Sequence, residues 1–271
     1  MKQTSEIVES VVQYASVWKL LVNELPNADL TDRPGLSISW ADNPFPFWNA
    51  VFLTEQLADP DLLESRLKEA AAYVRKKRHS GLIYVCEDYL SGTAKENLPA
   101  ILEQERLEAA IPITGMAGNV LPLQTLSSPP LRIERVIDEA MLQKYANINC
   151  EAYGFLLEWG QTALRGSNLW KEAYTFLGYE NGRAVSTASA IVTEEYLYLA
   201  LVATRPDARN KGYAEAVVRH ALQTAHEATG LKRTILHATG AGFPVYKRVG
   251  YHPTARLMTY KPSQNSKKVA N

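Results

Sequence analysis

The sequence predicts a mixed α/β fold in which a largely antiparallel sheet is flanked by helices. From the periodicity of their apolar side chains, residues 131–262 read in the order β-α-α-β-β-β-α-β-α-β. Asn181-Gly182 is a typical two-residue hairpin turn, which makes the middle strands antiparallel. The strand–helix–strand unit at 196–238 instead requires a parallel crossover. The predicted sheet is therefore mixed rather than doubly wound.

The elements of this second predicted domain follow one another with short connections. In order, we predict a strand at 131–136, a helix at 138–152, a helical stretch ending near 170, a hairpin at 175–192, a strand at 194–204, a helix at 209–229, a strand at 233–239, a short helix at 242–250 and a final strand at 251–262. The polar tail at 263–271 is predicted to be disordered.

Residues 1–128 are predicted to form a domain of their own, because LSSPP at 126–130 separates regular segments. Asp59 can cap a long helix there, and Pro60 suits its first turn. The predicted elements are a helix at 6–25, strands at 36–40 and 50–53, a helix at 59–79, a strand at 82–90, a helix at 95–110 and a strand with a turn at 110–123. We expect the aromatic-rich segment to pack in a core, with a pocket wall as the alternative: Trp40, Phe45, Phe47 and Trp48.

Charge is balanced over the chain but unevenly distributed. The 271 residues include 29 acidic and 29 basic side chains, and a neutral chain has no general bias toward nucleic acid or anionic membrane. From Ala228 to Asn271 there are eight Lys or Arg and no acid, which leaves residues 1–227 with a net charge of −8. The carboxyl-terminal end is therefore where we expect an anionic ligand.

Cysteine usage and the amino-terminal segment indicate a soluble cytoplasmic protein. Cys86 and Cys150 are too few for a disulfide framework and have no metal-ligand spacing, so we expect buried free thiols and no metal. Glu6 and Glu9 interrupt the start of the chain, which lacks the basic-then-apolar order of a signal peptide. The longest apolar run, Tyr196 to Ala203, is far shorter than the roughly 20 residues of a membrane helix.

The stretch VATRPDARNKGYAEAVVRHA, 202–221, reads as a strand end, a turn and a helix. Apolar residues along one face of the helix would fix it against a sheet, so its first-turn amides would point outward beside the strand end. Such a helix start binds phosphate oxygens, and Gly212 leaves room for a close ligand. Arg209 and Lys211 add positive charge to the rim. The alternative is an ordinary glycine turn with solvated basic residues.

In its context this stretch resembles the GNAT superfamily of N-acetyltransferases. RNKGYA fits the pattern Arg/Gln-x-x-Gly-x-Gly/Ala after a strand that ends V-A-T-x-P, and Tyr246 with Gly250-Tyr251 fits the later Tyr-x-x-x-Gly-Phe/Tyr pattern. The resemblance covers about 131–262. It implies that acetyl-CoA is the co-substrate and that the turn binds its pyrophosphate through Arg209, Asn210, Lys211, Gly212, Tyr213 and Ala214.

The same resemblance assigns roles to the preceding strand and to one tyrosine. It implies that the strand splays from its neighbour and that backbone groups of Val202, Ala203 and Thr204 hold the pantetheine arm and polarise the acetyl carbonyl. It also implies that Tyr246 protonates the leaving thiolate, which a phenol can do because it is neutral at pH 7. An asparagine that many members place before this tyrosine is replaced here by TGAGFP.

No general base stands out in the sequence. Glu194 and Glu195 lie at the start of the splayed strand, where a base could act directly or through water, but solvated strand-end carboxylates are the simpler interpretation. We expect surface or structural roles for the histidines of this half: His220, His226, His237 and His252.

The amino-terminal half loosely repeats the second and is predicted to be a degenerate GNAT-like domain, as in tandem members of the superfamily. The segment before its long helix carries Asp59 and Asp61 and no glycine, and these acids would repel a pyrophosphate.

Two functional hypotheses follow. The first is an N-acetyltransferase that moves an acetyl group to a small-molecule amine or a peptide amino group by direct attack in a ternary complex, with no nucleic acid or membrane partner. The second is an acyl-CoA-binding regulatory or interaction protein without turnover. A longer acyl donor and a homodimer both stay open.

Overall fold

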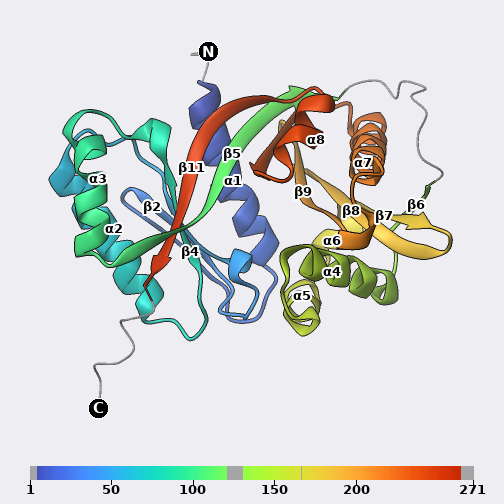
Figure 1. Cartoon of the computed structure of the whole chain (residues 1–271), viewed down its shortest axis with the longest axis horizontal. Coiled ribbons are helices and arrows are strands. Elements are labelled where there is room, and N and C mark those ends of the chain that lie inside the picture. The colour runs from blue at the N-terminus through green and yellow to red at the C-terminus, as the bar shows by residue number, and fades with distance from the viewer. Residues whose placement is uncertain (1–4, 121–130, 166, 264–271) are drawn as a thin grey trace. The chain divides into compact units, whose positions relative to one another are not determined.

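The computed structural model describes residues 5–120, 131–165 and 167–263 (Figure 1). The predicted boundary at 126–130 and the predicted disordered tail beyond residue 263 lie outside these ranges. Within the described ranges, no helix combines the length and the apolar character that a membrane crossing requires.

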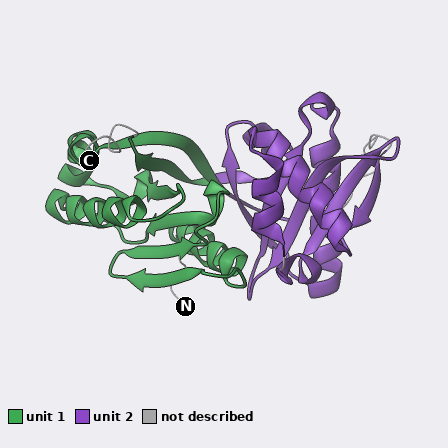
Figure 2. Cartoon of the chain, turned by 90° about the horizontal axis from the view of Figure 1, so that it is seen from below, with its two compact units in different colours: residues 1–115, 254–271 green, residues 116–253 purple. Residues whose placement is uncertain are grey.

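The chain divides into two compact units (Figure 2). Unit 1 contains residues 1–115 and 254–271, and unit 2 contains residues 116–253. The final strand, β11 (His252–Pro262), therefore contributes most of its length to unit 1, although the sequence places it in the second domain. An alternating pattern identifies a strand but not the sheet that it joins. In unit 1, β11 pairs antiparallel with β4 (Leu82–Cys86).

Unit 1 contains a sheet with the strand order β1-β2-β3-β4-β11-β5. Its elements are α1 (Glu6–Val22), β1 (Asp29–Arg33), β2 (Leu36–Trp40), β3 (Asn49–Leu53), α2 (Pro60–Arg75), β4, α3 (Gly92–Gln104) and β5 (Leu107–Asn119). The predicted helices and strands are present, but several of their bounds differ and one strand was not predicted. The strand β1 was not predicted, because its five residues are mostly polar and at least partly exposed. The predicted helix at 95–110 ends early, and β5 begins inside it.

The predicted turn within 110–123 is wrong for its described part, since β5 runs unbroken to Asn119. Gly115 and Gly118 do not form a turn; they lie in the strand at positions where atoms of other segments come close to the backbone. A Cβ at Gly115 would lie 2.2 Å from Ser10 Oγ, and one at Gly118 would lie 3.2 Å from the Gly250 carbonyl oxygen.

The core of unit 1 confirms the packing role for three of the four aromatic residues, whereas Phe47 is only partly buried. Trp40 and Trp48 are fully buried, and Phe45 is buried beside them. One cluster joins Trp40 to the apolar stripe of α2 and to residues of β2, β3 and β4. Asp59 caps α2 as predicted, with its carboxylate accepting from the Asp61 amide at 3.0 Å.

Unit 2 contains a mixed sheet with the strand order β10-β9-β8-β7-β6. Its elements are β6 (Arg132–Arg135), α4 (Glu139–Tyr153), α5 (Leu157–Leu164), α6 (Leu169–Glu172), β7 (Tyr174–Glu180), β8 (Arg183–Val192), β9 (Leu197–Thr204), α7 (Tyr213–Thr229), β10 (Arg233–Thr239) and α8 (Phe243–Arg248). The pairs from β6 to β9 are antiparallel, and β9 pairs parallel with β10. The prediction of a mixed α/β fold is confirmed.

Helices α7 and α4 cover opposite faces of this sheet (Figure 1). The buried face of α7 packs on Ala188 and Ala190 of β8 within one apolar cluster. Because side chains alternate along a strand, Ser189 points to the other face, where it meets Tyr145 of α4. The face under α7 is mainly apolar, whereas the face under α4 carries the hydroxyl groups of Thr187 and Ser189.

Candidate functional site

The strands β9 and β10 separate soon after they begin. Their parallel register pairs Thr234 with Leu197 and Ile235 with Tyr198, and within the described residues it extends no further. From Leu199 onward, one edge of β9 is therefore free of a neighbouring strand. The splay predicted for this strand is present in unit 2.

A bulge bends β9 at the point where the splay opens. On β8, Thr187 and Ser189 pair with Ala203 and Ala200, so two residues of β9 stand opposite Ala188. One of them, Leu201, has a φ of 47°, which places a leucine in the left-handed region. That conformation costs a non-glycine residue roughly 1–2 kcal/mol, and such strain gathers at functional sites.

The bulge decides which backbone groups of β9 face the splay. Ala203 faces β8, since its amide donates to Thr187 Oγ1 at 3.1 Å and its carbonyl accepts from Ser186 Oγ at 3.0 Å. Backbone groups alternate in direction along a strand, so the amide of Val202 faces the opposite, open edge. Thr204 Oγ1 lies 2.9 Å from Ser186 Oγ, which ties that side chain to β8.

The turn before α7 presents a row of unpaired amides. Asn210 and Gly212 have φ values of 63° and 80°, and the α7 N-cap, Gly212, offers no side chain to the helix start. The amides from Asn210 to Glu215 make no hydrogen bond to any residue that the structure describes. Unpaired amides on a seventeen-residue helix form an anion-binding surface.

The basic side chains of the turn are held by neighbours. Arg209 Nη2 donates to the Ala152 carbonyl at 2.9 Å, at the end of α4. Lys211 Nζ lies 2.9 Å from a Glu180 oxygen, and the Tyr213 hydroxyl also bonds to this carboxylate. Hydrogen bonds from Tyr213 and Lys211 hold the pKa of Glu180 below its usual range. The amides therefore offer the more direct contact for an anion, and Arg209 and Lys211 stand at the rim.

Tyr246 lies on α8 and is buried, with 8% of its surface exposed. Its ring belongs to the same apolar cluster as Val202 and packs edge-on against Tyr251. In the described parts of the chain no group bonds to its hydroxyl. Burial, then the neighbouring Tyr153, Tyr251 and Tyr145, raises the pKa of Tyr246. The phenol keeps its proton over the physiological range and has no competing acceptor for it.

The segment that replaces the expected asparagine has a structural role beside this tyrosine. Gly242 approaches the ring so closely that a Cβ would lie 2.8 Å from Tyr246 Cε2. Pro244 starts the short helix α8 in a position that suits its missing amide. The TGAGFP segment thus helps to position Tyr246, because the backbone at Gly242 packs directly against the tyrosine ring.

The base candidates are spread over unit 2. Glu194 and Glu195 are exposed in the turn before β9, at the end of the strand opposite to the bulge. His226 Nδ1 lies 2.9 Å from the Leu231 carbonyl and His220 packs on Phe176, which suits the structural roles expected of them. His237 Nδ1 lies 2.8 Å from the Tyr198 hydroxyl, and burial lowers its pKa to about 3.

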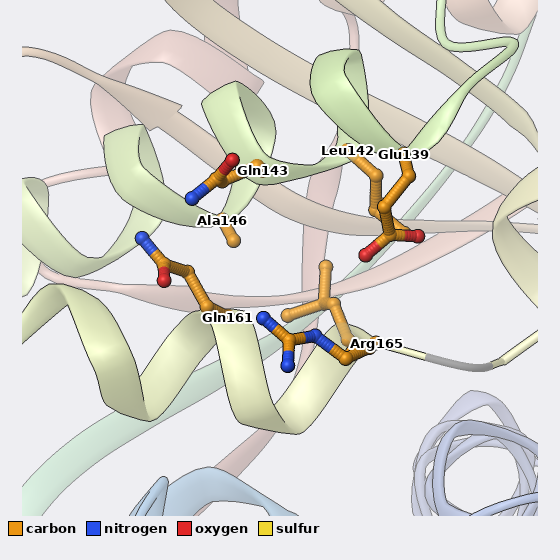
Figure 3. Close-up of a pocket in the computed structure, with 7 residues that line it drawn as sticks. Glu139, Leu142, Gln143, Ala146, Gln161 and Arg165 are labelled. Atoms are coloured by element: carbon orange, nitrogen blue, oxygen red, sulfur yellow. The ribbon is translucent and has the colours of Figure 1, made fainter.

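A separate pocket of about 230 Å³ lies between α4 and α5 (Figure 3). Figure 3 shows Glu139, Leu142, Gln143 and Ala146 on one side of it, facing Gln161 and Arg165 on the other. None of the predicted site residues lines this pocket. Among the residues described, no group of three or more His, Cys, Asp or Glu could hold a metal ion.

The bulge at Leu201 is the feature of the site that the sequence did not reveal. A left-handed residue in a strand is usually signalled by glycine, and LYLALVAT contains none. The one available signal was the row of hydroxyl residues on β8, Ser186, Thr187 and Ser189, in an otherwise apolar strand.

Comparison with known proteins gives one family match and no curated relative. Residues 140–251 match the acetyltransferase (GNAT) family. No curated protein matches the chain.

Several solved structures have a similar fold. A GCN5-related N-acetyltransferase from Kribbella flavida has a TM-score of 0.66 at 15% identity, over 93% of this chain and 95% of that one. One from Sphaerobacter thermophilus has a TM-score of 0.58 at 14% identity, over 86% of this chain and 75% of that one. A tandem GNAT protein from the clavulanic acid biosynthesis pathway has a TM-score of 0.55 at 14% identity, over 94% of this chain and 95% of that one. The likeness covers both units, so the shared fold includes the amino-terminal one.

Proposed function

Because the chain carries a domain of the GNAT acyltransferases at 140–251, we propose that it moves an acetyl group from acetyl-CoA to a primary amine by direct attack in a ternary complex. The observation that carries this proposal is the combination, within unit 2, of an open strand edge at Val202 and a helix start with unpaired amides at Asn210 to Glu215. The open strand edge suits the thioester end of acetyl-CoA, and the unpaired amides suit its pyrophosphate.

The residues present fit acetyl-CoA in chemical terms. The amides from Asn210 to Glu215 would hold the pyrophosphate, with Arg209 and Lys211 at the rim. Val202, Ala203 and Thr204 would hold the pantetheine arm along the open edge. When bound, acetyl-CoA supplies a thioester whose carbonyl an amine can attack. The Val202 amide would donate to that carbonyl oxygen and stabilise its developing charge.

Tyr246 would hold a proton at its hydroxyl oxygen and donate it to the thiolate that leaves when the C–S bond of the thioester breaks. The raised pKa keeps that proton available across the working pH range, and no described group competes for it. The acceptor in this proposal is a small-molecule amine or a peptide amino group. Both cysteines are buried free thiols, which suits a reducing compartment such as the cytoplasm.

The test is acetyl-CoA-dependent CoA release with a broad panel of amines. We expect turnover with some amines, and Tyr246→Phe should lower kcat by roughly 10²- to 10⁴-fold because it removes the proton donor. The KM for acetyl-CoA should change little, since the ring remains. Binding without turnover on every amine, unchanged in Tyr246→Phe, would favour the non-catalytic acyl-CoA-binding protein instead.

A further inference from the structure

The backbone carbonyl of Leu201 is surrounded by hydroxyl groups. Thr187 Oγ1 donates to it at 2.9 Å from β8, and the Tyr145 hydroxyl donates to it at 3.1 Å from α4. A carbonyl oxygen has two lone pairs, so both are used. The residue at the centre of the β9 bulge is therefore held by two side chains from two different elements.

The neighbours of Thr187 fix the direction of its proton. Its Oγ1 receives the Ala203 amide at 3.1 Å and Asn149 Nδ2 at 3.2 Å, which fills its accepting capacity. Its single proton is left for a carbonyl, and Leu201 at 2.9 Å is nearer than Ala203 at 3.4 Å. Thr187 thus bonds to both sides of the bulge at once.

The Tyr145 hydroxyl also has one proton and two partners within reach. Besides the Leu201 carbonyl, Ser189 Oγ lies 3.0 Å away. A carbonyl can only accept, whereas the serine hydroxyl can donate, so giving the Tyr145 proton to Leu201 satisfies both contacts. Ser189 in turn lies 2.7 Å from Thr175 Oγ1, which makes Thr175 one step more remote from the bulge.

Burial makes these bonds hard to replace. The side chains of Thr187 and Tyr145 are fully buried, so water cannot take over a lost donor. A Leu201 carbonyl without its donors would favour regular pairing of β9 with β8. Removing the extra residue from a bulge turns the following residues to the other edge. The Val202 amide would then face β8 instead of the splay.

We propose that Thr187 and Tyr145 are positioning residues, which hold the β9 bulge so that the Val202 amide points toward the acetyl carbonyl. This inference rests on the proposed function, since it gives that amide its purpose. Neither residue touches the substrate in this account. Both act through the backbone of Leu201.

The structure offers a matched pair of variants for the test. Thr187→Val and Thr175→Val each remove one hydroxyl from a fully buried threonine on neighbouring strands, and only the first loses a bond to Leu201. Thr187→Val should lower kcat by roughly ten- to a hundredfold, as a small misplacement of a reacting group does. Thr175→Val should keep kcat near the wild-type value. Both should bind CoA as the wild type does, because the turn before α7 is unchanged.

A spectroscopic readout separates positioning from stability. Acetyl-CoA labelled with ¹³C at the acetyl carbonyl should show a downfield shift on binding to the wild type and to Thr175→Val. Thr187→Val and Tyr145→Phe should lose most of that shift, because the hydrogen bond to the carbonyl is displaced. Equal shifts and equal kcat in the two threonine variants would overturn the proposal, whatever their melting temperatures.

The two proposals fail in different ways. The carbonyl shift is measured without an amine, so it tests Thr187 even if no amine is acetylated. If no amine is turned over but the shift is present in the wild type and Thr175→Val and lost in Thr187→Val, the transferase activity is overturned and the positioning role is supported. If Thr187→Val does not fold, Tyr145→Phe, which keeps the ring in place, provides the same comparison against Thr175→Val.

Discussion

Each unit contains a strand–helix–strand crossover, and the two crossover helices differ at their amino-terminal ends: α2 is capped by a side chain, whereas α7 is not. In unit 1, α2 links the parallel strands β3 and β4, and in unit 2, α7 links β9 and β10. Asp59 caps α2 with its own carboxylate, Pro60 has no amide and Asp61 adds a second negative charge. Gly212 leaves α7 uncapped.

The strands beside these helices differ in the same sense. β3 and β4 have five residues each and pair at three successive positions, Ala50 to Phe52. In the described residues, β9 has eight residues and pairs with β10 at two positions, opposite Thr234 and Ile235. The two units therefore share a topology but differ at the helix start. In unit 1 a side chain caps the first turn of α2, whereas in unit 2, within the part of the chain that the structure describes, the first-turn amides of α7 are unpaired and lie beside a strand edge without a neighbour. Under the proposed function, capping chemistry and strand separation, rather than topology, would decide which unit binds acetyl-CoA.

The largest expected effect comes from closing the open helix start. Gly212→Glu places a side chain and a negative charge against the amides, and the affinity for acetyl-CoA should fall by about a hundredfold or more. Gly230→Glu is the matched control. Gly230 caps the other end of α7 at a φ of 75° and has open space around its Cβ position.

Both substitutions strain a left-handed glycine position to a similar extent, so calorimetric titration isolates the contribution of the phosphate site. Gly230→Glu should retain wild-type affinity. Equal affinities in the two folded variants would show that the α7 turn does not bind the pyrophosphate.

The next largest effect concerns the capped start of α2 in unit 1. Asp59→Ala removes the α2 cap and should lower the free energy of unfolding by about 1 kcal/mol in a urea titration. Acetyl-CoA binding should not change, because Pro60 and Asp61 still oppose a phosphate there. Asp138→Ala, which removes the α4 cap on the Met141 amide, is the control for a similar loss of stability in unit 2.

A gain of acetyl-CoA binding in Asp59→Ala would instead mean that one carboxylate alone closes the amino-terminal unit. That result would leave no role for Pro60, Asp61 or the continuous pairing of β3 with β4.

The smallest effect concerns Glu180, the acid beside the open turn. Glu180→Gln removes a negative charge near the amides and releases Lys211, so acetyl-CoA should bind a few-fold more tightly at low ionic strength. Glu227→Gln makes the same change near the far end of α7 and should have no effect. Weaker binding in Glu180→Gln would show that Glu180 is needed to place Lys211 and Tyr213.

The sequence predicted the parts of the site that depend on local signals. Gly212, the apolar stripe of α7 and the Asn181-Gly182 pair are local signals for a turn, a packed helix and a hairpin, and the structure places a helix start and a hairpin there. The sequence did not predict the early end of α3, because the left-handed residue after the helix is Arg106, with a φ of 47°, and not a glycine.

Longer-range features were out of reach for a different reason. The sheet that β11 joins depends on pairing with β4, about 170 residues away in the chain, which no local pattern encodes. The bulge at Leu201 depends on hydroxyls from β8 and α4, and so it becomes visible only when these elements are packed together.

The stoichiometry of acetyl-CoA binding tests the contrast between the two units most directly. Isothermal titration of the full chain should give one acetyl-CoA per chain, bound by unit 2, and this site should be lost in Gly212→Glu. Two bound molecules per chain would contradict the closed helix start of unit 1. No binding to the folded wild-type protein would contradict the open helix start of unit 2 and, with it, the proposed function.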